Sequence, residues 1–484
     1  MTKRNHILAV FAISAMLILA GLLAVRTPSL AAGTTSTYLP IAFKRYPAQT
    51  IFGMELQVSK AGMEAFKATG PSWVRQNGLL WSQVEPNKGE RNWAAAANLE
   101  SNLVEFARQN IKPILIVRST PAWAQKIAGA TCGPILEAEL ASFGQFMYDA
   151  VARYSQPPYN VKYWEIWNEP DAVYSPTSPN GPYGCWGDPT DPYYGGGYYA
   201  SMLQAVYPQI KAADPNAIVL VGGLLLDCDP RPVNGGPSYC AQWGNNELPP
   251  MYFEGILRNN GGNYFDGISF HAYDYFYYTS PELGHYASVI WGSYWNTTGP
   301  VGPVKAAFIR QLLAQYNVTG KFLVNTESAL ICGGANDAPG GAGCEADPGS
   351  LYEQTKARYV TQAYAAALAD GQQANIWFSL FGWRNSGLIY SDLSPRPAYT
   401  AFQFASAELA GFSFQRLVTD YPGTQIYEFI DNGRNLWVVW SLDGANHDLT
   451  LPFTPLAIYD FMGTSLPANT SLSISLDPLF IEWK

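Results

Sequence analysis

Short apolar runs alternate with longer amphipathic stretches along most of this chain. The apolar runs are rich in β-branched and aromatic residues, which is typical of strands buried in a sheet. The predicted strands are Ile51–Leu56, Trp73–Leu79, Pro113–Arg118, Tyr163–Trp167, Ile218–Leu224, Gly267–His271, Phe322–Thr326 and Asn375–Leu380. The helices predicted between them include Asn98–Gln109, Ala138–Tyr154, Tyr198–Ala213, Val304–Tyr316 and Tyr352–Ala369. Strand–helix alternation repeated about eight times predicts an α/β fold, a (β/α)8 or TIM barrel over residues 51–410.

A doubly wound sheet is the competing fold for this alternation. It would place a glycine-rich phosphate loop after the first strand, and the segment FGMELQVSKAG is not such a loop. Loop lengths favour the barrel. Connections from helix to strand are short, as at 110–112, 156–160, 214–217 and 317–321. Connections from strand to helix are often long, as at 170–197, 227–248, 274–300 and 328–350. Because strand-to-helix loops share one rim of a barrel, the chain places its extra length where active sites lie.

The pattern changes from about Gly411 onward. Helical spacing ends, and short alternating runs such as QIYEFI, NLWVVWSL and LFIEWK follow, separated by turn signals at Asn432-Gly433 and Asp443-Gly444. This pattern predicts a small C-terminal β-sandwich domain, residues 411–484, packed against the barrel. We expect it to be structural. Carbohydrate binding is the alternative, if Trp437 and Trp440 are exposed.

The N-terminus has the pattern of an export signal. Lys3, Arg4 and His6 precede the apolar run Ile7–Val25, and small residues follow it. We expect a signal peptide over residues 1–32, followed by a polar linker over 33–50. The apolar run is also long enough to act as a retained membrane anchor. The protein is therefore predicted to be secreted or extracytoplasmic, with membrane contact only if this segment is not cleaved.

Six cysteines in an exported chain predict disulfide bonds. Cys228 and Cys240 lie close together in a loop-like segment, and so do Cys332 and Cys344, which leaves Cys132 and Cys185 for each other. A zinc site is the competing interpretation. It is disfavoured because the chain has no C-x-x-C motif and only 4 histidines.

The composition indicates the kind of ligand. Charged residues make up 14% of the chain, aromatic residues also make up 14%, and the net charge is -9. An acidic chain without a lysine or arginine run is not expected to bind nucleic acid. Low charge and many aromatic side chains suit a neutral ligand with flat apolar faces. The sequence does not predict the oligomeric state.

Two glutamates occupy matching places in the predicted barrel. Glu169 ends the fourth strand in WEIWNEP, and Glu327 ends the seventh in FLVNTES. Two carboxylates that face each other across a barrel mouth are what glycoside hydrolysis needs, because one must donate a proton and the other must be ionised. The structural alternative is that each glutamate caps the next helix or pairs with an arginine.

At these positions the chain resembles the clan A retaining glycoside hydrolases, through W-N-E-P on the fourth strand and the glutamate of the seventh. Together with STPAW (Ser119–Trp123), WEIWNEPD makes it most similar to glycoside hydrolase family 39. The resemblance covers about residues 51–410. It implies that Glu169 is the acid/base and Glu327 the nucleophile of a double displacement. The substrate-binding residues that it implies are Arg75, Asn168, His271, Tyr273 and Trp383.

Each supporting residue also has a structural alternative. Arg75 would pair with Glu165 inside the barrel, His271 would be a core histidine, and Trp383 would pack in the core. The expected substrate is a β-linked polysaccharide or oligosaccharide, and the reaction requires no metal and no organic cofactor. A glycan-binding protein on a degenerate barrel and a transglycosylase are the alternative functions.

Overall fold

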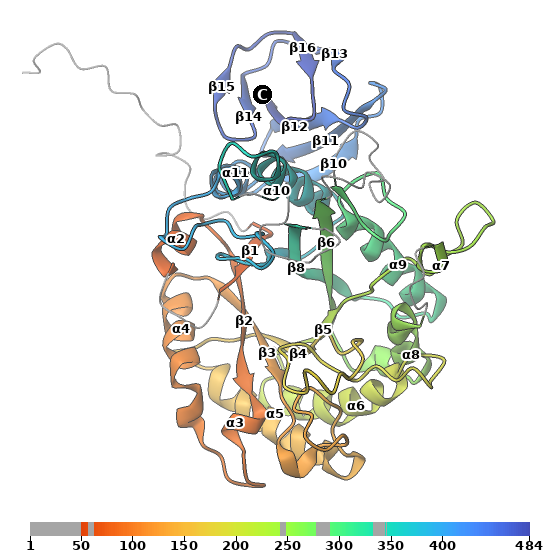
Figure 1. The fold of residues 1–484 in the computed structure, drawn as a ribbon. Coiled ribbons are helices and arrows are strands. Elements are labelled where there is room, and N and C mark those ends of the chain that lie inside the picture. Colours follow the sequence, from red (N-terminus) through yellow and green to blue (C-terminus); the bar gives the residue numbers. More distant parts are fainter. Residues whose placement is uncertain (1–49, 57–61, 243–247, 277–290, 333–343, 345) are drawn as a thin grey trace, which may run out of the picture. The chain divides into compact units, whose positions relative to one another are not determined.

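Eight parallel strands close into a barrel in the computed structural model (Figure 1), which describes residues 50–56, 62–242, 248–276, 291–332, 344 and 346–484. The strands are β1 (Phe52–Glu55), β2 (Trp73–Leu80), β3 (Lys112–Arg118), β4 (Tyr163–Asn168), β5 (Ile218–Leu224), β6 (Gly267–Phe276), β8 (Phe322–Cys332) and β9 (Ala374–Trp377). Pairing between β5 and β6 closes the barrel, and the two-residue strand β7 (Trp291–Gly292) adds antiparallel to β6. The predicted TIM barrel is confirmed.

Helices follow the strands in the order that the apolar spacing predicts. They are α2 (Met63–Ala68), α3 (Trp81–Val84), α4 (Ala97–Arg108), α5 (Leu140–Tyr154), α6 (Gly196–Ala213), α7 (Tyr239–Gln242), α8 (Tyr252–Arg258), α9 (Val301–Gln315), α10 (Leu351–Ala369) and α11 (Pro397–Glu408). Short 3-10 helices cover Trp93–Ala96, Ala122–Ala124, Glu137–Glu139, Pro249–Met251 and Gly261–Asn263. In α5, Phe143, Met147 and Val151 are fully buried, as expected for residues on one face at helical spacing.

Two strands are longer than their apolar runs predict. β6 continues past His271 to Phe276, and β8 continues past Thr326 to Cys332, because the two strands stay paired through Phe276 and Cys332. Glu327 therefore lies inside β8, and the prediction that it ends the strand is wrong. β9 is shorter than predicted and stops at Trp377, from which the chain turns into the loop that carries Trp383.

An apolar layer fills the barrel interior near the amino-terminal ends of the strands. It contains Trp73, Ile114, Leu220, Val324 and Ile376, all almost fully buried near the beginnings of their strands. Side chains two residues apart on a strand point to the same face. Arg75 follows Trp73 by two positions, so the layer above the apolar one is polar and lies nearer the carboxyl ends of the strands.

The C-terminal strands form a six-stranded antiparallel sheet and a two-stranded one. The six-stranded sheet has the order β10 (Ser413–Leu417), β11 (Thr424–Asp431), β12 (Arg434–Ser441), β17 (Leu479–Trp483), β14 (Ala457–Asp460), β15 (Ser465–Leu466). β13 (His447–Thr450) pairs with β16 (Ser471–Ile474). Phe480 packs edge-on against Phe404 of α11, with 5.1 Å between ring centroids. The predicted C-terminal β domain is confirmed.

The two tryptophans on which carbohydrate binding by this domain depended are buried. Trp437 is 5% exposed and Trp440 is 1% exposed. Trp437 packs in the core of the domain beside Trp483, and Trp440 packs against Tyr427. Trp437 and Trp440 are three positions apart on β12, so they lie on opposite faces of the strand, and both faces are buried. Neither side chain is available to a sugar. The expectation that they are exposed is wrong.

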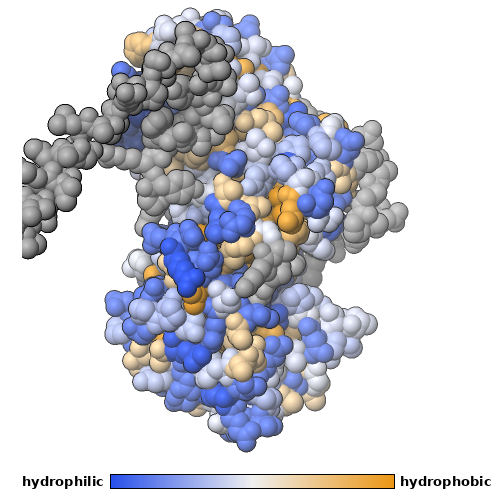
Figure 2. Space-filling model, turned by 90° about the vertical axis from the view of Figure 1, so that its left-hand side faces the viewer, coloured by the Kyte–Doolittle hydropathy of each residue, from blue (hydrophilic) through white to orange (hydrophobic). Residues whose placement is uncertain are grey.

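Figure 2 shows a mainly hydrophilic face on which apolar residues gather only in small groups. No helix among the described residues is long and apolar enough to cross a bilayer. The predicted signal or anchor, Ile7–Val25, lies outside the described residues, as does the linker up to residue 49.

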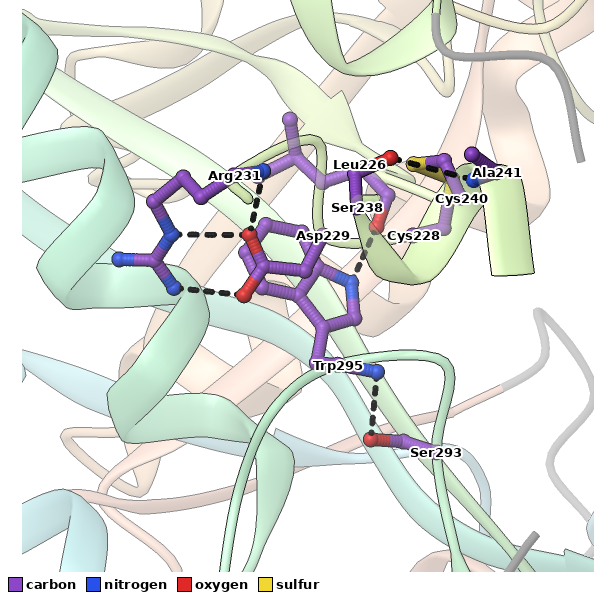
Figure 3. The surroundings of a disulfide bond; sticks show 9 residues. All are labelled: Leu226, Cys228, Asp229, Arg231, Ser238, Cys240, Ala241, Ser293 and Trp295. Carbon is purple, nitrogen blue, oxygen red and sulfur yellow. Dashed lines mark hydrogen bonds and ion pairs between the residues drawn. A yellow bond between two sulfur atoms is a disulfide. The ribbon is translucent and has the colours of Figure 1, made fainter. Parts of the chain in front are cut away.

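Three disulfides join the pairs that the sequence spacing predicts: Cys132 with Cys185, Cys228 with Cys240, and Cys332 with Cys344. The zinc interpretation of these cysteines is wrong. Figure 3 shows Cys228–Cys240 in the loop after β5, where Arg231 makes a two-point ion pair with Asp229 and the Trp295 indole N–H donates to the Leu226 carbonyl. The disulfide thus closes a loop that is already held to the barrel by polar contacts.

We expect the Cys132–Cys185 bond to contribute most to stability. It closes the longest loop, with a sequence separation of 53 against 12 for each of the other two. Chain entropy then assigns it about 4 kcal/mol, against about 3 kcal/mol for a shorter loop. Equilibrium urea unfolding of the paired cysteine-to-serine variants measures this order. A smaller loss for Cys132→Ser/Cys185→Ser than for Cys228→Ser/Cys240→Ser would contradict it.

Candidate active site

A fully buried guanidinium, Arg75 of β2, is the centre of the polar layer. Its Nε and Nη2 donate to the two oxygens of Glu165 on β4, each at 2.9 Å. Nη1 donates to Glu55 of β1 at 2.7 Å and to Glu327 of β8. Nη2 also donates to Asn168 Oδ1 at 2.5 Å. The expected pairing of Arg75 with Glu165 is therefore present together with contacts to both Glu327 and Asn168.

Glu327 is held at two points. Arg75 donates to its Oε1, and the Tyr273 hydroxyl on β6 donates to its Oε2. The residue is 5% exposed, and its Cα pairs with that of His271 across the β6–β8 ladder. A carboxylate that accepts from a guanidinium and a hydroxyl is fixed in orientation and has its negative charge balanced.

Glu169 follows the last residue of β4 and has a backbone φ of 47°, while Trp167 has a φ of 74°. Non-glycine residues seldom adopt this region, and such strain is found mostly where a site needs a particular side-chain direction. The Glu169 amide donates to the Gly223 carbonyl of β5 at 2.9 Å, which fixes the turn. Burial raises the pKa of Glu169 to about 7, the Arg75 charge opposes this rise, and the Asp227 carboxylate adds to it.

His271 joins the two glutamates. Its Nδ1 lies 2.9 Å from Glu169 Oε1 and 3.5 Å from Glu327 Oε2. Burial lowers the pKa of His271 to about 4, so the ring is neutral near pH 7. The ring fits because residue 223 is glycine: a Cβ there would lie 2.1 Å from His271 Nε2. The core-histidine interpretation is right about burial, but the ring also contacts a carboxylate of the site.

Trp383 is 53% exposed, so the interpretation as a core residue is wrong. Its ring lies edge-on to that of Tyr273, with 6.4 Å between centroids. The buried Lys356 ammonium of α10 holds this loop, since it donates to the carbonyls of Asn385 at 2.8 Å and Gly387 at 2.9 Å. An exposed indole on a fixed loop beside the two glutamates is suited to stack on a flat apolar ligand face.

The sequence analysis missed several charged residues of the site. Glu55 is the last residue of β1, so the strand-end rule that singled out Glu169 would have found it. Burial raises the pKa of Glu55 to about 8, although the Arg75 charge opposes this. Lys305 of α9 donates to the Leu225 carbonyl at 2.6 Å and to the His271 carbonyl at 2.9 Å. Nothing in the local helical pattern of Lys305 distinguishes it from a surface lysine.

A metal ion is the competing use of this cluster. Ligand atoms of Glu169, His271 and Glu327 all lie within 4.8 Å of one another. Both oxygens of Glu327 already accept hydrogen bonds, one of them from the Arg75 guanidinium. A cation beside a prospective ligand repels a metal ion, so the contacts present favour proton transfer over metal binding.

No protein-family model matches this chain, and no curated protein is similar to it in sequence. Solved structures do resemble it. A family 39 glycoside hydrolase from the gut symbiont Bacteroides cellulosilyticus WH2 has a TM-score of 0.64 and 17% identity, over 90% of this chain and 81% of that one. The catalytic domain of GH30 xylanase C from Talaromyces cellulolyticus has a TM-score of 0.57 and 13% identity, over 91% and 98%.

A GH86 protein in complex with neoagarooctaose has a TM-score of 0.58 and 11% identity, over 90% of this chain and 74% of that one. At these identities the likeness establishes a shared fold. The chain thus has the barrel and C-terminal β domain found in these glycoside hydrolases, in accordance with the family resemblance of the sequence.

The raised pKa of Glu169 predicts a pH-dependent cost in stability. The group titrates near 4.5 in the unfolded chain and at about 7 in the folded protein. Its favourable contribution is complete below pH 4.5 and is lost as pH rises through 7, which amounts to at most about 3 kcal/mol. The free energy of unfolding of Glu169→Gln minus that of wild type should therefore be larger at pH 8 than at pH 4.

Urea unfolding at both pH values measures this difference. The control is Glu90→Gln, which removes an exposed carboxylate outside the site. A difference between Glu169→Gln and wild type that stays the same at pH 4 and pH 8 would contradict the assignment of a raised pKa to Glu169.

Proposed function

We propose that this protein is an exported retaining glycoside hydrolase, with Glu327 as the nucleophile and Glu169 as the acid/base. The observation that carries the proposal is the separation of the two carboxyl groups, whose nearest ligand atoms lie within 4.8 Å. Retaining enzymes place the two groups about 5–5.5 Å apart, whereas inverting enzymes place them about 6.5–9.5 Å apart to leave room for a water molecule.

The first step follows from the hydrogen bonds of the site. Glu327, held by Arg75 and Tyr273, attacks the anomeric carbon and forms a glycosyl ester. The bond from that carbon to the leaving oxygen breaks, and Glu169 gives its proton to this oxygen. A pKa of about 7 keeps a large share of Glu169 protonated at neutral pH, as a general acid requires.

The second step reverses the role of Glu169. Its carboxylate takes a proton from water, the water oxygen attacks the anomeric carbon, and the ester to Glu327 breaks. The neutral His271 ring, 2.9 Å from Glu169 Oε1, orients this carboxyl group in both protonation states, since its Nδ1 can accept or donate. Asn168 and Trp383 are proposed to bind the sugar, the first through a hydroxyl and the second through an apolar ring face.

The substrate class is a β-linked polysaccharide or its oligosaccharides. The exposed Trp383 beside Tyr273 supports a sugar ligand, and the structural neighbours include a GH30 xylanase and a GH86 protein bound to neoagarooctaose. Export by a signal over residues 1–32 is supported by the three disulfides, which form in oxidising compartments. We place the catalytic domain at residues 51–410 and the β-sandwich at 411–484.

The effect of Glu169→Ala on the first step should depend on the leaving group of the substrate. Glycosides with a poor leaving group need the proton, so we expect their kcat/KM to fall by about 100-fold or more. Nitrophenyl glycosides leave without a proton, so their first step should change far less. Comparison of nitrophenyl and alkyl glycosides of the same sugar measures this, and equal losses for both would remove Glu169 from the role of acid.

A 2-deoxy-2-fluoro glycoside should label Glu327. The fluorine slows the second step, so the glycosyl ester accumulates, and intact-mass measurement of a panel of such reagents identifies the sugar by its added mass. Peptide mapping should place the adduct on Glu327. Glu327→Gln should form no adduct and lose activity by a factor on the order of 10³ or more.

Glu90→Gln, at an exposed carboxylate, is the control for this experiment and should label as wild type does. An adduct on another residue would overturn the assignment of the nucleophile. Binding of polysaccharides in gels without any turnover by the wild-type protein would instead identify a glycan-binding protein.

A further inference from the structure

Arg118 is a cation of the barrel mouth that the proposed mechanism does not use. It is the last residue of β3, and its Cα pairs with Leu80 of β2. Ile114, four positions earlier on the same strand, belongs to the apolar layer inside the barrel. Since alternate residues of a strand share a face, Arg118 points to the inner side of the barrel, at the rim where strand-to-helix loops begin.

A hydrogen bond to Asn77 orients the Arg118 guanidinium. Its Nε donates to Asn77 Oδ1 at 2.6 Å, and Asn77 lies at the point where the β2–β3 register shifts. The next residue, Ser119, has a φ of 79°, so the chain turns sharply away immediately after the arginine. The hydrogen bond to Asn77 holds one edge of the guanidinium, and Nη1 and Nη2 have no hydrogen-bond partner among the described residues.

Arg118 lies close to the charges that hold Glu327. Burial lowers the pKa of Arg118 to about 10, the Glu55 charge opposes this, and the Arg75 charge adds to it. Glu55 and Arg75 are hydrogen-bonded to each other, and Arg75 donates to Glu327. The cation therefore lies at the same carboxyl-terminal rim of the barrel as the proposed nucleophile.

Most other arginines of the described residues pair with carboxylates. Arg231 contacts Asp229, Arg310 contacts Asp370, and Arg396 contacts Glu353. Within the described part of the chain, Arg118 has no carboxylate within ion-pair distance, and its hydrogen bond to Asn77 is made by Nε alone. A half-buried guanidinium without a direct ion pair has lost hydration that an anion would replace, and its planar fork matches a carboxylate or a sulfate with two parallel hydrogen bonds.

We propose that Arg118 binds an anionic substituent of the glycan, a uronic acid carboxylate or a sulfate ester, beside the reacting sugar. This inference rests on the proposed glycosidase function and adds a charged contact to a cleft for which the composition predicts a neutral ligand. Such an anion would supply the acceptors that Nη1 and Nη2 of Arg118 lack among the described residues. The two anions share their chemistry, and matched substrates distinguish them.

The test compares matched pairs of glycans on four proteins. The pairs are glucuronoxylan with its carboxyl-reduced form, and carrageenan with its desulfated form. The proteins are wild type, Arg118→Met, Arg118→Lys, and the control Arg108→Met, whose side chain on α4 is 72% exposed. Cleavage is measured as kcat/KM, and binding of oligosaccharides from each pair is measured by calorimetry with Glu169→Gln present in every protein, so that binding is observed without turnover.

We expect wild type and Arg108→Met to prefer the anionic member of one pair by about tenfold or more, as for a hydrogen-bonded charge pair. Arg118→Met should reduce that preference to about twofold or less, and Arg118→Lys should keep a part of it because a lysine offers charge without the fork. A preference within the glucuronoxylan pair would identify the anion as a carboxylate, and a preference within the carrageenan pair would identify it as a sulfate.

Equal binding of the charged and neutral members of both pairs by wild type would overturn the proposal. So would an unchanged preference in Arg118→Met, or losses in that variant that are equal for both members, which would indicate a purely structural role beside Asn77. Failure of the proposed function has a different signature: preferential binding of the anionic member that depends on Arg118, without cleavage of any glycan.

Discussion

The structure depends on one buried charge, the Arg75 guanidinium, and on the carboxylates around it. A guanidinium inside a barrel is tolerated only if anions surround it, and buried carboxylates are tolerated only if a cation balances them. Glu55, Glu165 and Glu327 come from three different strands and meet Arg75 on a fourth. The network therefore ties β1, β2, β4 and β8 together at one level of the barrel, directly above the apolar layer.

This constraint also places the chemistry. The apolar layer occupies the beginnings of the strands, so the charged layer can lie only toward their carboxyl ends, where the long loops begin. The proposed nucleophile is held by the network itself. Glu169 is not: it stands at a strained turn after β4, and among the described residues its carboxyl group is hydrogen-bonded to His271. The two carboxyl groups thus have different hydrogen-bond partners.

Two side chains near the charged layer, Trp383 and Arg118, have roles in the proposals for ligand binding. Trp383 stands on a loop that a buried lysine holds by its carbonyls, and Arg118 stands at the end of a strand and is directed by Asn77. The Cys228–Cys240 disulfide closes the loop after β5. Under the proposed function, the exposed indole of Trp383 would contact an apolar sugar face and Arg118 an anionic substituent of the glycan.

The amino-acid pattern predicted the barrel, the C-terminal β domain, the disulfide pairs and the meeting of Glu169 and Glu327. Each of these leaves a local mark in the sequence: apolar runs of a certain length, a change of period, cysteines close in the chain, and a carboxylate where an apolar run stops. Tertiary structure decided the rest. The continuation of β6 and β8, which moves Glu327 into the middle of its strand, comes from their pairing with each other. The burial of Trp437 and Trp440 comes from packing that no alternation reveals. Lys305 acquires its role only from neighbours distant in the chain, because electrostatic partnership depends on spatial position and leaves no period in a sequence.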